Sequence, residues 1–340
     1  MARQFTPTGI TINVGLGPCA SRCRYCQLSN YSTFTSGAER AVALVDKIIA
    51  YTQQAGLKEF TVYHWTGNSF DIPIQDFANE IALHKRHGDR LRVLLLGGLP
   101  YREQEEMQVW FAERKAVGTE LITGTFAGTY AIHDYWNNMR GNFDFQIDAL
   151  RLAGKMGFEL TLRCLLMQST LPCLEKLLNI WDSIDGNILH RSAYPLFYSG
   201  LAKKLEEERI TRSMLDALSK RARALLDDAQ TWKTEREWVE AARTEHADDH
   251  EKAGLTLNLT DSIIARLESL SAEEIIDDLA KRTKSAYALL PPRAELAEKY
   301  SDRHNDKLYS RMWDMETLWM DRYLRERPLS FERELTLFGH

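Results

Sequence analysis

The sequence predicts an α/β protein in which a partial (β/α)6 barrel precedes an α-helical C-terminal region. Segments typical of strands and of helices alternate about six times over the first 200 residues. This rhythm indicates βαβ units that build a parallel sheet. One segment, 91–96, is apolar but for a single arginine, as expected of a parallel strand that is buried on both faces. Six units are fewer than the eight of a closed TIM barrel, so we expect an open one.

The elements of the first half follow from apolar periodicity and from the residues that end each run. In the first strand Ile10, Ile12 and Val14 alternate with other residues, and Gly15 breaks the pattern. Later strands are expected at 60–66, 91–96, 120–125, 159–167 and 188–195, and helices at 38–55, 73–88, 101–115, 143–156 and 174–182.

The sequence changes character after about Gly200, where strand signals fade and helical periodicity takes over. We expect residues 1–205 to form the barrel and residues 206–340 to form helices that cap it and shape the substrate site. Ser271-Ala272-Glu273-Glu274 is a capping box, which marks the start of a helix. The stretch 227–252 is rich in Asp, Glu, Lys and His, and we interpret it as a solvated face or a connector.

Composition limits the classes of protein to which the chain can belong. Its 340 residues are 44% hydrophobic, which suffices for a sizeable core, and a net charge of −5 gives no basic excess for binding nucleic acid. The N-terminus has no apolar signal core, and no run of about 18 apolar residues suggests a membrane span. Five cysteines, three clustered and two scattered, do not form a disulfide framework. We therefore expect a protein of the reducing cytoplasm.

Three of the cysteines form the most informative motif. Cys19, Cys23 and Cys26 lie within eight residues, spaced four apart and then three, on a loop at the C-terminal end of the first strand. That end is where barrels of this class place their chemistry. Such a loop can hold one face of an iron–sulfur cube and leave one iron open, because no fourth cysteine is near. A zinc knuckle is the alternative, although zinc usually requires a fourth Cys or His at close spacing.

This spacing, with Tyr25 directly before the third cysteine, resembles the radical S-adenosylmethionine (radical SAM) superfamily over residues 9–200. The resemblance implies that Cys19, Cys23 and Cys26 hold a 4Fe-4S cluster whose open iron is chelated by the amine and carboxylate of S-adenosyl-L-methionine (SAM). It implies that Tyr25 packs near the adenine. The run from His133-Asp134 to Arg140-Gly141-Asn142-Phe143 resembles the region after the fourth strand. Tyr194 resembles the end of the sixth strand, whose backbone brackets the adenine in this superfamily.

Two further cofactor contacts are implied by the same resemblance. Thr66-Gly67-Asn68 is the nearest match to the Gly-Gly-Glu run that holds the SAM ammonium. Asn68 supplies a hydrogen-bond acceptor but no charge, so SAM binding should survive, since such a bond is worth about 1.5–3 kcal/mol. Ser69 or Asp71 could share the task. Arg163, on the fifth strand, resembles the residues that hold the SAM carboxylate; a buried ion pair is the alternative.

Cys173 follows Pro172 in the loop after the fifth strand. A thiol there could donate a hydrogen atom to a substrate radical, as in epimerases of the superfamily. The interpretation that we favour is a small apolar packing residue. Period two places Arg163 on the strand face opposite Cys164.

The resemblance implies an enzyme in which the reduced cluster passes one electron to SAM. The products are methionine and a 5′-deoxyadenosyl radical, which abstracts a hydrogen atom from the substrate. Flavodoxin or ferredoxin is the implied electron donor. The first strand starts near residue 9, which leaves no room before it for a peptide-recognition or cobalamin-binding domain. We therefore expect a small-molecule substrate of specialised metabolism, such as a sugar, nucleoside or amino-acid derivative. The alternatives are a radical SAM peptide maturase that acts on a ribosomal peptide, and a non-catalytic zinc- or cluster-binding protein. The class of reaction is left open.

Overall fold

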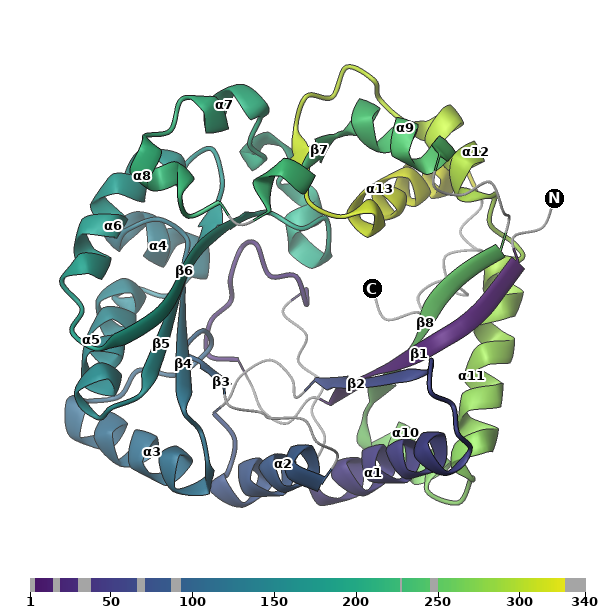
Figure 1. Ribbon diagram of the computed structural model, residues 1–340, viewed down its shortest axis with the longest axis horizontal. Helices are drawn as coiled ribbons and strands as arrows, with labels where there is room; N and C mark the ends of the chain where they lie inside the picture. Colours follow the sequence, from purple (N-terminus) through teal and green to yellow (C-terminus); the bar gives the residue numbers. More distant parts are fainter. Residues whose placement is uncertain are drawn as a thin grey trace.

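Parallel strands surround a central space and helices lie outside them in the computed structural model of this chain (Figure 1). The model describes residues 4–14, 19–29, 38–65, 71–86, 93–226, 228–244 and 250–327. This arrangement confirms the predicted fold class, an open barrel of parallel strands followed by a largely helical region.

The barrel strands belong to two parallel sheets. In the first sheet β1 (Gln4–Val14) lies between β2 (Thr61–Trp65) and β8 (His250–Leu259). In the second sheet β3 (Val93–Leu95), β4 (Leu121–Phe126), β5 (Glu159–Leu166) and β6 (Asn187–Pro195) pair in chain order. A short antiparallel pair, β7 (Lys233–Thr234) and β9 (Leu308–Tyr309), lies in the C-terminal region.

The helices of the first half lie within a few residues of the predicted ranges, except for one helix that the sequence did not predict. They are α1 (Ala38–Gln54), α2 (Ile74–Arg86), α3 (Gln104–Val117), the unpredicted α4 (Tyr130–Asn137), α5 (Asn142–Lys155) and α6 (Leu174–Asp182). The later helices are α7 (Arg212–Asp216), α8 (Lys220–Arg223), α9 (Glu235–Thr244), α10 (Asp261–Leu267), α11 (Ala272–Tyr287), α12 (Arg293–Tyr300) and α13 (Met312–Arg325). Within the described ranges, every helix is too short or too polar to cross a membrane.

Two predictions for the C-terminal region have different outcomes. The capping box is confirmed, because the Ser271 hydroxyl accepts the Glu274 N–H and the Glu274 carboxylate accepts the Ser271 N–H. The stretch 227–252 is not simply a connector. It contains α9, whose Val239 is fully buried, and the start of β8. The strand β8 was missed in the sequence because a run of charged residues precedes it, although the Leu residues of β8 alternate with polar ones.

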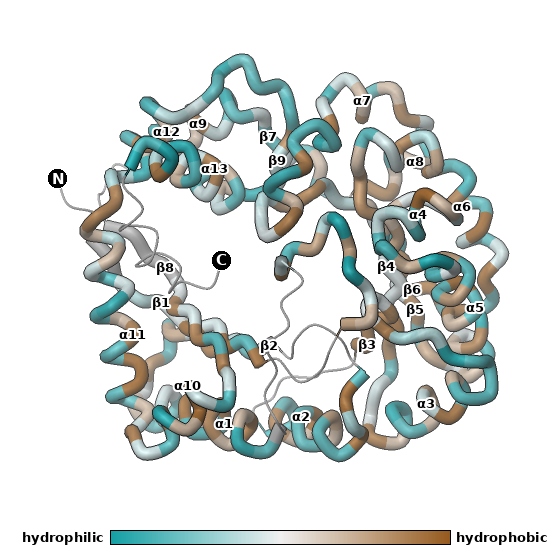
Figure 2. The backbone as a smooth tube through the Cα atoms, turned by 180° about the vertical axis from the view of Figure 1, so that it is seen from behind, coloured by the Kyte–Doolittle hydropathy of each residue, from teal (hydrophilic) through white to brown (hydrophobic). Residues whose placement is uncertain are grey.

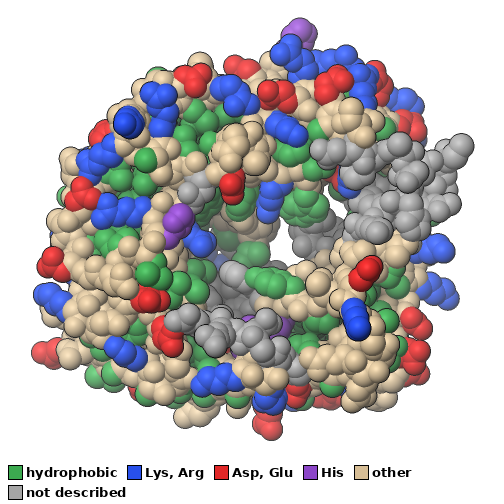
Figure 3. Space-filling view, viewed as in Figure 1, with side chains coloured by type: hydrophobic (Ala, Val, Ile, Leu, Met, Phe, Trp, Pro, Cys, Tyr) green, Lys and Arg blue, Asp and Glu red, His purple; other side chains and the backbone are tan. Residues whose placement is uncertain are grey.

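The two faces of the sheets differ in polarity. The faces toward the helices are apolar: Ile12 of β1, Leu162 of β5 and Leu257 of β8 all belong to the main core. Figure 2 shows such apolar residues recurring along both the strands and the surrounding helices. The opposite faces carry polar side chains, among them Thr11, Asn13, Thr125, Thr161, Arg163, Ser192, Thr256 and Asn258. The space-filling view shows a hollow at the centre of the ring, so these polar faces surround a cavity (Figure 3).

The helices α9, α12 and α13 form a second, smaller core beside the end of β6. Its buried side chains include Trp238, Leu296, Met315 and Trp319. Glu235, at the start of α9, is fully buried and forms an ion pair with Arg322. The segment after β6 is joined to this core, because the Tyr198 N–H donates to Asp314 Oδ1 of α13 at 3.0 Å. The end of β6 therefore connects the barrel to the C-terminal helices.

Candidate functional site

The cysteine loop, residues 19–29, follows β1 and runs through the space that the strands surround (Figure 1). Backbone hydrogen bonds fix it to three segments that are distant in the sequence. The Ala20 N–H donates to the carbonyl of Gly98, beyond β3, and the Arg24 N–H donates to that of Trp136 in α4. The Leu201 N–H, beyond β6, donates to the Cys26 carbonyl. The loop is thus held at the ends of the strands, as the sequence predicted.

The three thiols of the loop are partly buried and lie close enough to influence one another. Burial, reinforced by the charges of Cys19 and Cys26, raises the pKa of Cys23 to about 12. Burial also raises the pKa of Cys19. Protonated thiols are poor metal ligands, so a bound cationic centre must provide the energy to ionise them. A donor set of three adjacent thiols suits a soft metal centre such as an iron–sulfur cluster.

Gly200 lies directly against the cysteine loop. Its backbone has φ of +51°, and a Cβ atom at this position would overlap the carbonyl oxygens of Cys26 and Gln27. Only glycine avoids both the steric overlap and the left-handed strain. The run from Tyr194 to Gly200 therefore positions the loop through its backbone, which the sequence motif did not reveal.

A buried polar network leads away from Cys23. The His133 ring is fully buried, and burial lowers its pKa to about 4, so the ring is neutral near pH 7. Its Nδ1 accepts the Ala127 N–H at 3.1 Å. The ring proton therefore lies on Nε2, which is 2.9 Å from Asn142 Oδ1. Gln146 extends the network along α5 by donating to the same Asn142 oxygen.

This tautomer determines the orientation of the Asn137 side-chain amide. One terminal atom of the amide lies 2.6 Å from His133 Nε2, and the other lies 3.1 Å from Cys23 Sγ and 2.6 Å from the Tyr25 hydroxyl. Since His133 Nε2 is a donor, the amide oxygen must face it and the NH₂ group must face Cys23. The Tyr25 hydroxyl also hydrogen-bonds Cys23 and lowers the pKa of that thiol. Two donors therefore point at the Cys23 sulfur.

The run from His133 to Phe143 also caps a helix. Asp134 Oδ2 accepts the Gly141 N–H at 2.6 Å and its Oδ1 accepts the Phe143 N–H at 2.9 Å. A carboxylate at this end of α5 satisfies free N–H groups and stabilises the helix dipole. Gly141 has φ of +77° and forms the turn into the helix. This run thus fixes α4 and α5 against each other beneath the cysteine loop.

Arg163 and Tyr194 lie on the inner wall of the barrel. Arg163 is next to Thr125 on β4 and Ser192 on β6, on the face opposite Cys164, as period two predicted. Its side chain is exposed and has no ion-pair partner among the described residues, which argues against a buried ion pair. Burial raises the pKa of Tyr194 to about 12, and the Arg163 charge opposes this rise.

A pocket lies beside Tyr194, along the outer edge of β6, where the Ala193 N–H donates to the Leu225 carbonyl. Its volume is about 260 Å³. The lining includes Tyr194, Pro195, Phe197 and Trp232. The rings of Tyr194 and Phe197 stack with centroids 5.7 Å apart and planes tilted by 21°. A flat aromatic wall of this kind can bind the face of a planar ring.

The remaining predicted site residues have different outcomes. Cys173 is buried at the start of α6, and its thiol lies near that of Cys164, which belongs to the outer core. This position favours the packing interpretation. Thr66, Gly67 and Asn68, like Ser69, lie outside the described residues. Sequence reasoning did not find Asn137; the available signal was its spacing of four from His133 on one helix.

Comparisons with known proteins find similarity only among solved structures. No family model and no curated protein matches the chain. Native anSMEcpe with bound AdoMet matches at 13% identity over 55% of this chain and 51% of that chain, with a TM-score of 0.40. The same enzyme with bound AdoMet and Cp18Cys peptide matches at 10% identity over 97% and 99% of the two chains, with a TM-score of 0.48.

Coproporphyrinogen III oxidase (HemN) from Escherichia coli, a radical SAM enzyme, matches at 10% identity over 94% of this chain and 90% of that chain, with a TM-score of 0.45. In the first of the two anSMEcpe matches the chain spans about half the length of that protein. The likeness is distant in both sequence and shape, and function is inferred from the chain's own residues.

We expect Gly200→Ala to loosen the attachment of the cysteine loop. The substitution forces a strained backbone and a clash with two carbonyl groups, which should lower the free energy of unfolding by about 1–3 kcal/mol. Denaturant unfolding measures this loss, and iron content after reconstitution reports the damage to the loop.

Gly97→Ala is the matched control, because a Cβ there meets nothing within 4 Å. The proposed contact is wrong if Gly200→Ala matches this control in both stability and iron content.

Proposed function

We propose that this chain is a radical SAM enzyme, with Cys19, Cys23 and Cys26 as ligands of a 4Fe-4S cluster. The observation that supports this best is the placement of three mutually interacting thiols on a loop that is held at the strand ends, within the central space (Figure 1). When bound, the cluster and SAM supply one-electron cleavage of the sulfonium, which yields a 5′-deoxyadenosyl radical able to abstract hydrogen. A zinc knuckle would require a fourth ligand close to the loop, and among the described residues the ligand atoms that cluster belong to a group elsewhere, which includes none of these cysteines.

The protein's contribution at Cys23 is to stabilise negative charge on sulfur. The Asn137 amide and the Tyr25 hydroxyl both donate toward this atom. Hydrogen bonds to a ligand sulfur favour the reduced, more negative state of a cluster and so raise its potential. The neutral His133 ring fixes the amide in the donating orientation. The network therefore holds one hydrogen-bond donor next to the sulfur on which negative charge would increase on reduction.

The inner wall provides groups that suit the parts of SAM. The Arg163 guanidinium can form a bidentate pair with a carboxylate, through two parallel hydrogen bonds. The pocket beside Tyr194 and Phe197 suits the adenine ring, with Tyr25 nearby in the same small cluster of side chains. We retain Thr66, Gly67 and Asn68 as the proposed partners of the ammonium. Cys173 has no role in this proposal beyond packing.

The polar inner faces support a small, polar substrate. Asn13 and Asn258 hydrogen-bond each other at 2.7 Å across β1 and β8, and hydroxyl side chains line the opposite sheet. Such a wall can recognise the hydroxyl or amide groups of a sugar, nucleoside or amino-acid derivative. We propose that α9, α12 and α13 cap the barrel, through the link between Tyr198 and α13, whereas β8, which also lies within residues 206–340, is part of the barrel itself. Flavodoxin or ferredoxin is the proposed electron donor.

Anaerobic incubation with SAM and a strong reductant tests this function. The reconstituted protein should contain about four irons and release 5′-deoxyadenosine, which chromatography measures. Replacement of any one of Cys19, Cys23 or Cys26 by Ala should abolish this product, because three thiolates are needed to leave a single open iron.

Cys173→Ala is the matched control and should retain SAM cleavage. One bound zinc and no iron in the wild-type protein, or full cleavage by Cys23→Ala, would remove the enzyme proposal.

Asn137→Ala should make the cluster potential more negative. Loss of one donor of about 0.5–1.5 kcal/mol corresponds to roughly 20–60 mV for a one-electron couple. A redox titration followed by electron paramagnetic resonance measures the shift, and Asn137→Ser, which keeps a donor, should recover part of it. An unchanged potential in a fully loaded variant would show that the amide does not act on the cluster.

Arg163→Gln should weaken SAM binding between about 10- and 100-fold, the value of a hydrogen bond to a charged group. Equilibrium binding to the reconstituted protein measures the dissociation constant. Arg163→Lys keeps the charge without the planar fork, so it should lose less. Wild-type affinity in Arg163→Gln would mean that the carboxylate is held elsewhere.

A further inference from the structure

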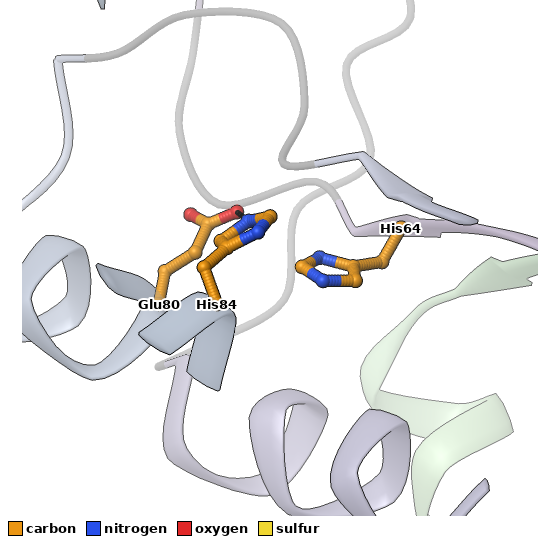
Figure 4. Close-up of side chains that lie close together, drawn as sticks. All are labelled: His64, Glu80 and His84. Carbon is orange, nitrogen blue, oxygen red and sulfur yellow. Dashed lines mark ion pairs between the residues drawn. The ribbon is translucent and has the colours of Figure 1, made fainter. Parts of the chain in front are cut away.

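Three side chains with metal-ligating atoms meet between β2 and α2, in the outer layer of the barrel. His64 lies on β2, and Glu80 and His84 lie one turn apart on α2. Figure 4 shows the His64 ring extending from the strand toward the two side chains of the helix. One ligand atom from each residue can be chosen so that all three lie within 4.8 Å of one another.

This cluster is separate from the cysteine loop. On β1 and β2, Ile12 is the register partner of His64, and Ile12 faces the helices as part of the main core. His64 therefore points outward, whereas the thiols lie on the inner side. The neighbouring residues on the buried face of α2, Phe77 and Ile81, are apolar. The three polar side chains thus interrupt a layer that is otherwise hydrophobic.

The burial of this cluster requires an explanation in terms of charge. Glu80 is 1% exposed, His64 is 6% exposed, and the His84 side chain is 12% exposed. A carboxylate placed in such surroundings without compensation costs several kcal/mol. Among the described residues, Glu80 forms its ion pair with His84, whose Nε2 lies 3.8 Å from Glu80 Oε1, beyond hydrogen-bond range. Neither Glu80 Oε2 nor His84 Nδ1 has a hydrogen-bond partner in the described part of the chain.

The two imidazole rings lie close enough together to bind one ion between them. Their centroids are 4.1 Å apart and their planes are tilted by 40°. The contact between Glu80 and His84 leaves the second carboxylate oxygen, Oε2, without a partner in the described ranges. A divalent cation between the three groups would compensate the carboxylate and use neutral imidazole nitrogens as ligands.

We propose that His64, Glu80 and His84 bind one Zn²⁺ ion. Two imidazole nitrogens and one carboxylate oxygen are a donor set that zinc accepts, with a fourth position left for water or another group. Zinc bonds of about 2.0–2.2 Å place tetrahedral ligands roughly 3.4 Å apart. The 3.8 Å separation of the Glu80 and His84 atoms needs only a small side-chain adjustment. Bound zinc ties the end of β2 to α2.

Zinc binding is tested in the full chain with Cys19, Cys23 and Cys26 all replaced by Ala. This background removes the competing thiols. After exposure to zinc and dialysis, elemental analysis should find about one zinc per chain. Cobalt added in place of zinc should give visible bands of a nitrogen- and oxygen-ligated ion, without a thiolate charge-transfer band.

Glu80→Gln and His84→Asn, each made in that background, should weaken zinc binding by about 100-fold or more, since even the loss of an outer partner costs 10–100-fold. His304→Ala, an exposed histidine away from the cluster, is the matched control and should bind zinc normally. Circular dichroism verifies that each variant is folded. If Glu80→Gln fails to fold, the cobalt spectrum of the intact cluster and His84→Asn still decide.

Absence of stoichiometric zinc and of the cobalt bands in the thiol-free chain would overturn the proposal and leave a Glu80–His84 ion pair as the account of the cluster. Zinc bound with equal affinity by His84→Asn would assign the metal to other residues. Neither result would affect the cysteine site, because these measurements are made without it.

Discussion

The parallel sheets of this protein turn their apolar faces outward, toward the helices, and the rest of the structure depends on this orientation. Burial of Ile12, Leu162 and Leu257 against the helices stabilises the shell, at roughly 1.5–3 kcal/mol for each large side chain. The inner faces then contribute mainly to a small apolar cluster at the strand ends, around Leu165 and Tyr194. A closed barrel would fill its interior with branched apolar residues. Here threonine, asparagine, serine and arginine line the interior, and a loop with three thiols can enter it.

That loop has no secondary structure of its own, so its shape depends on partners that come from elsewhere in the sequence. Hydrogen bonds from beyond β3, β4 and β6 fix its backbone at three points. A neutral buried histidine, through Asn137, fixes the donors around one sulfur. Both devices use backbone and amide groups, whose directions are rigid, instead of long flexible side chains. They place polar atoms accurately without adding net charge to the site.

The predictable parts were those encoded in local pattern. Alternation identified β1, and terminating glycines bounded the helices; α6 begins and ends where predicted. The unpredicted α4 has an inverted pattern, because its buried residues include His133 and Asn137 while Tyr135 is exposed. Apolar periodicity in the sequence therefore does not reveal this helix. The zinc cluster was hidden for another reason: Glu80 and His84 show helical spacing, but only the packing of β2 on α2 adds His64. The need for glycine at position 200 likewise arises from a contact with residues 26 and 27.

The pairing of β8 with β1 has a consequence for how the molecule is made. β1 must wait for residues 250–259, which come far later in the sequence, before its second edge is covered. Until then it exposes unpaired N–H and C=O groups, and the thiol loop that follows it has an incomplete support. Closing a contact over so long a separation is slow. The cysteine loop therefore gains its full support only after the chain has been made through β8.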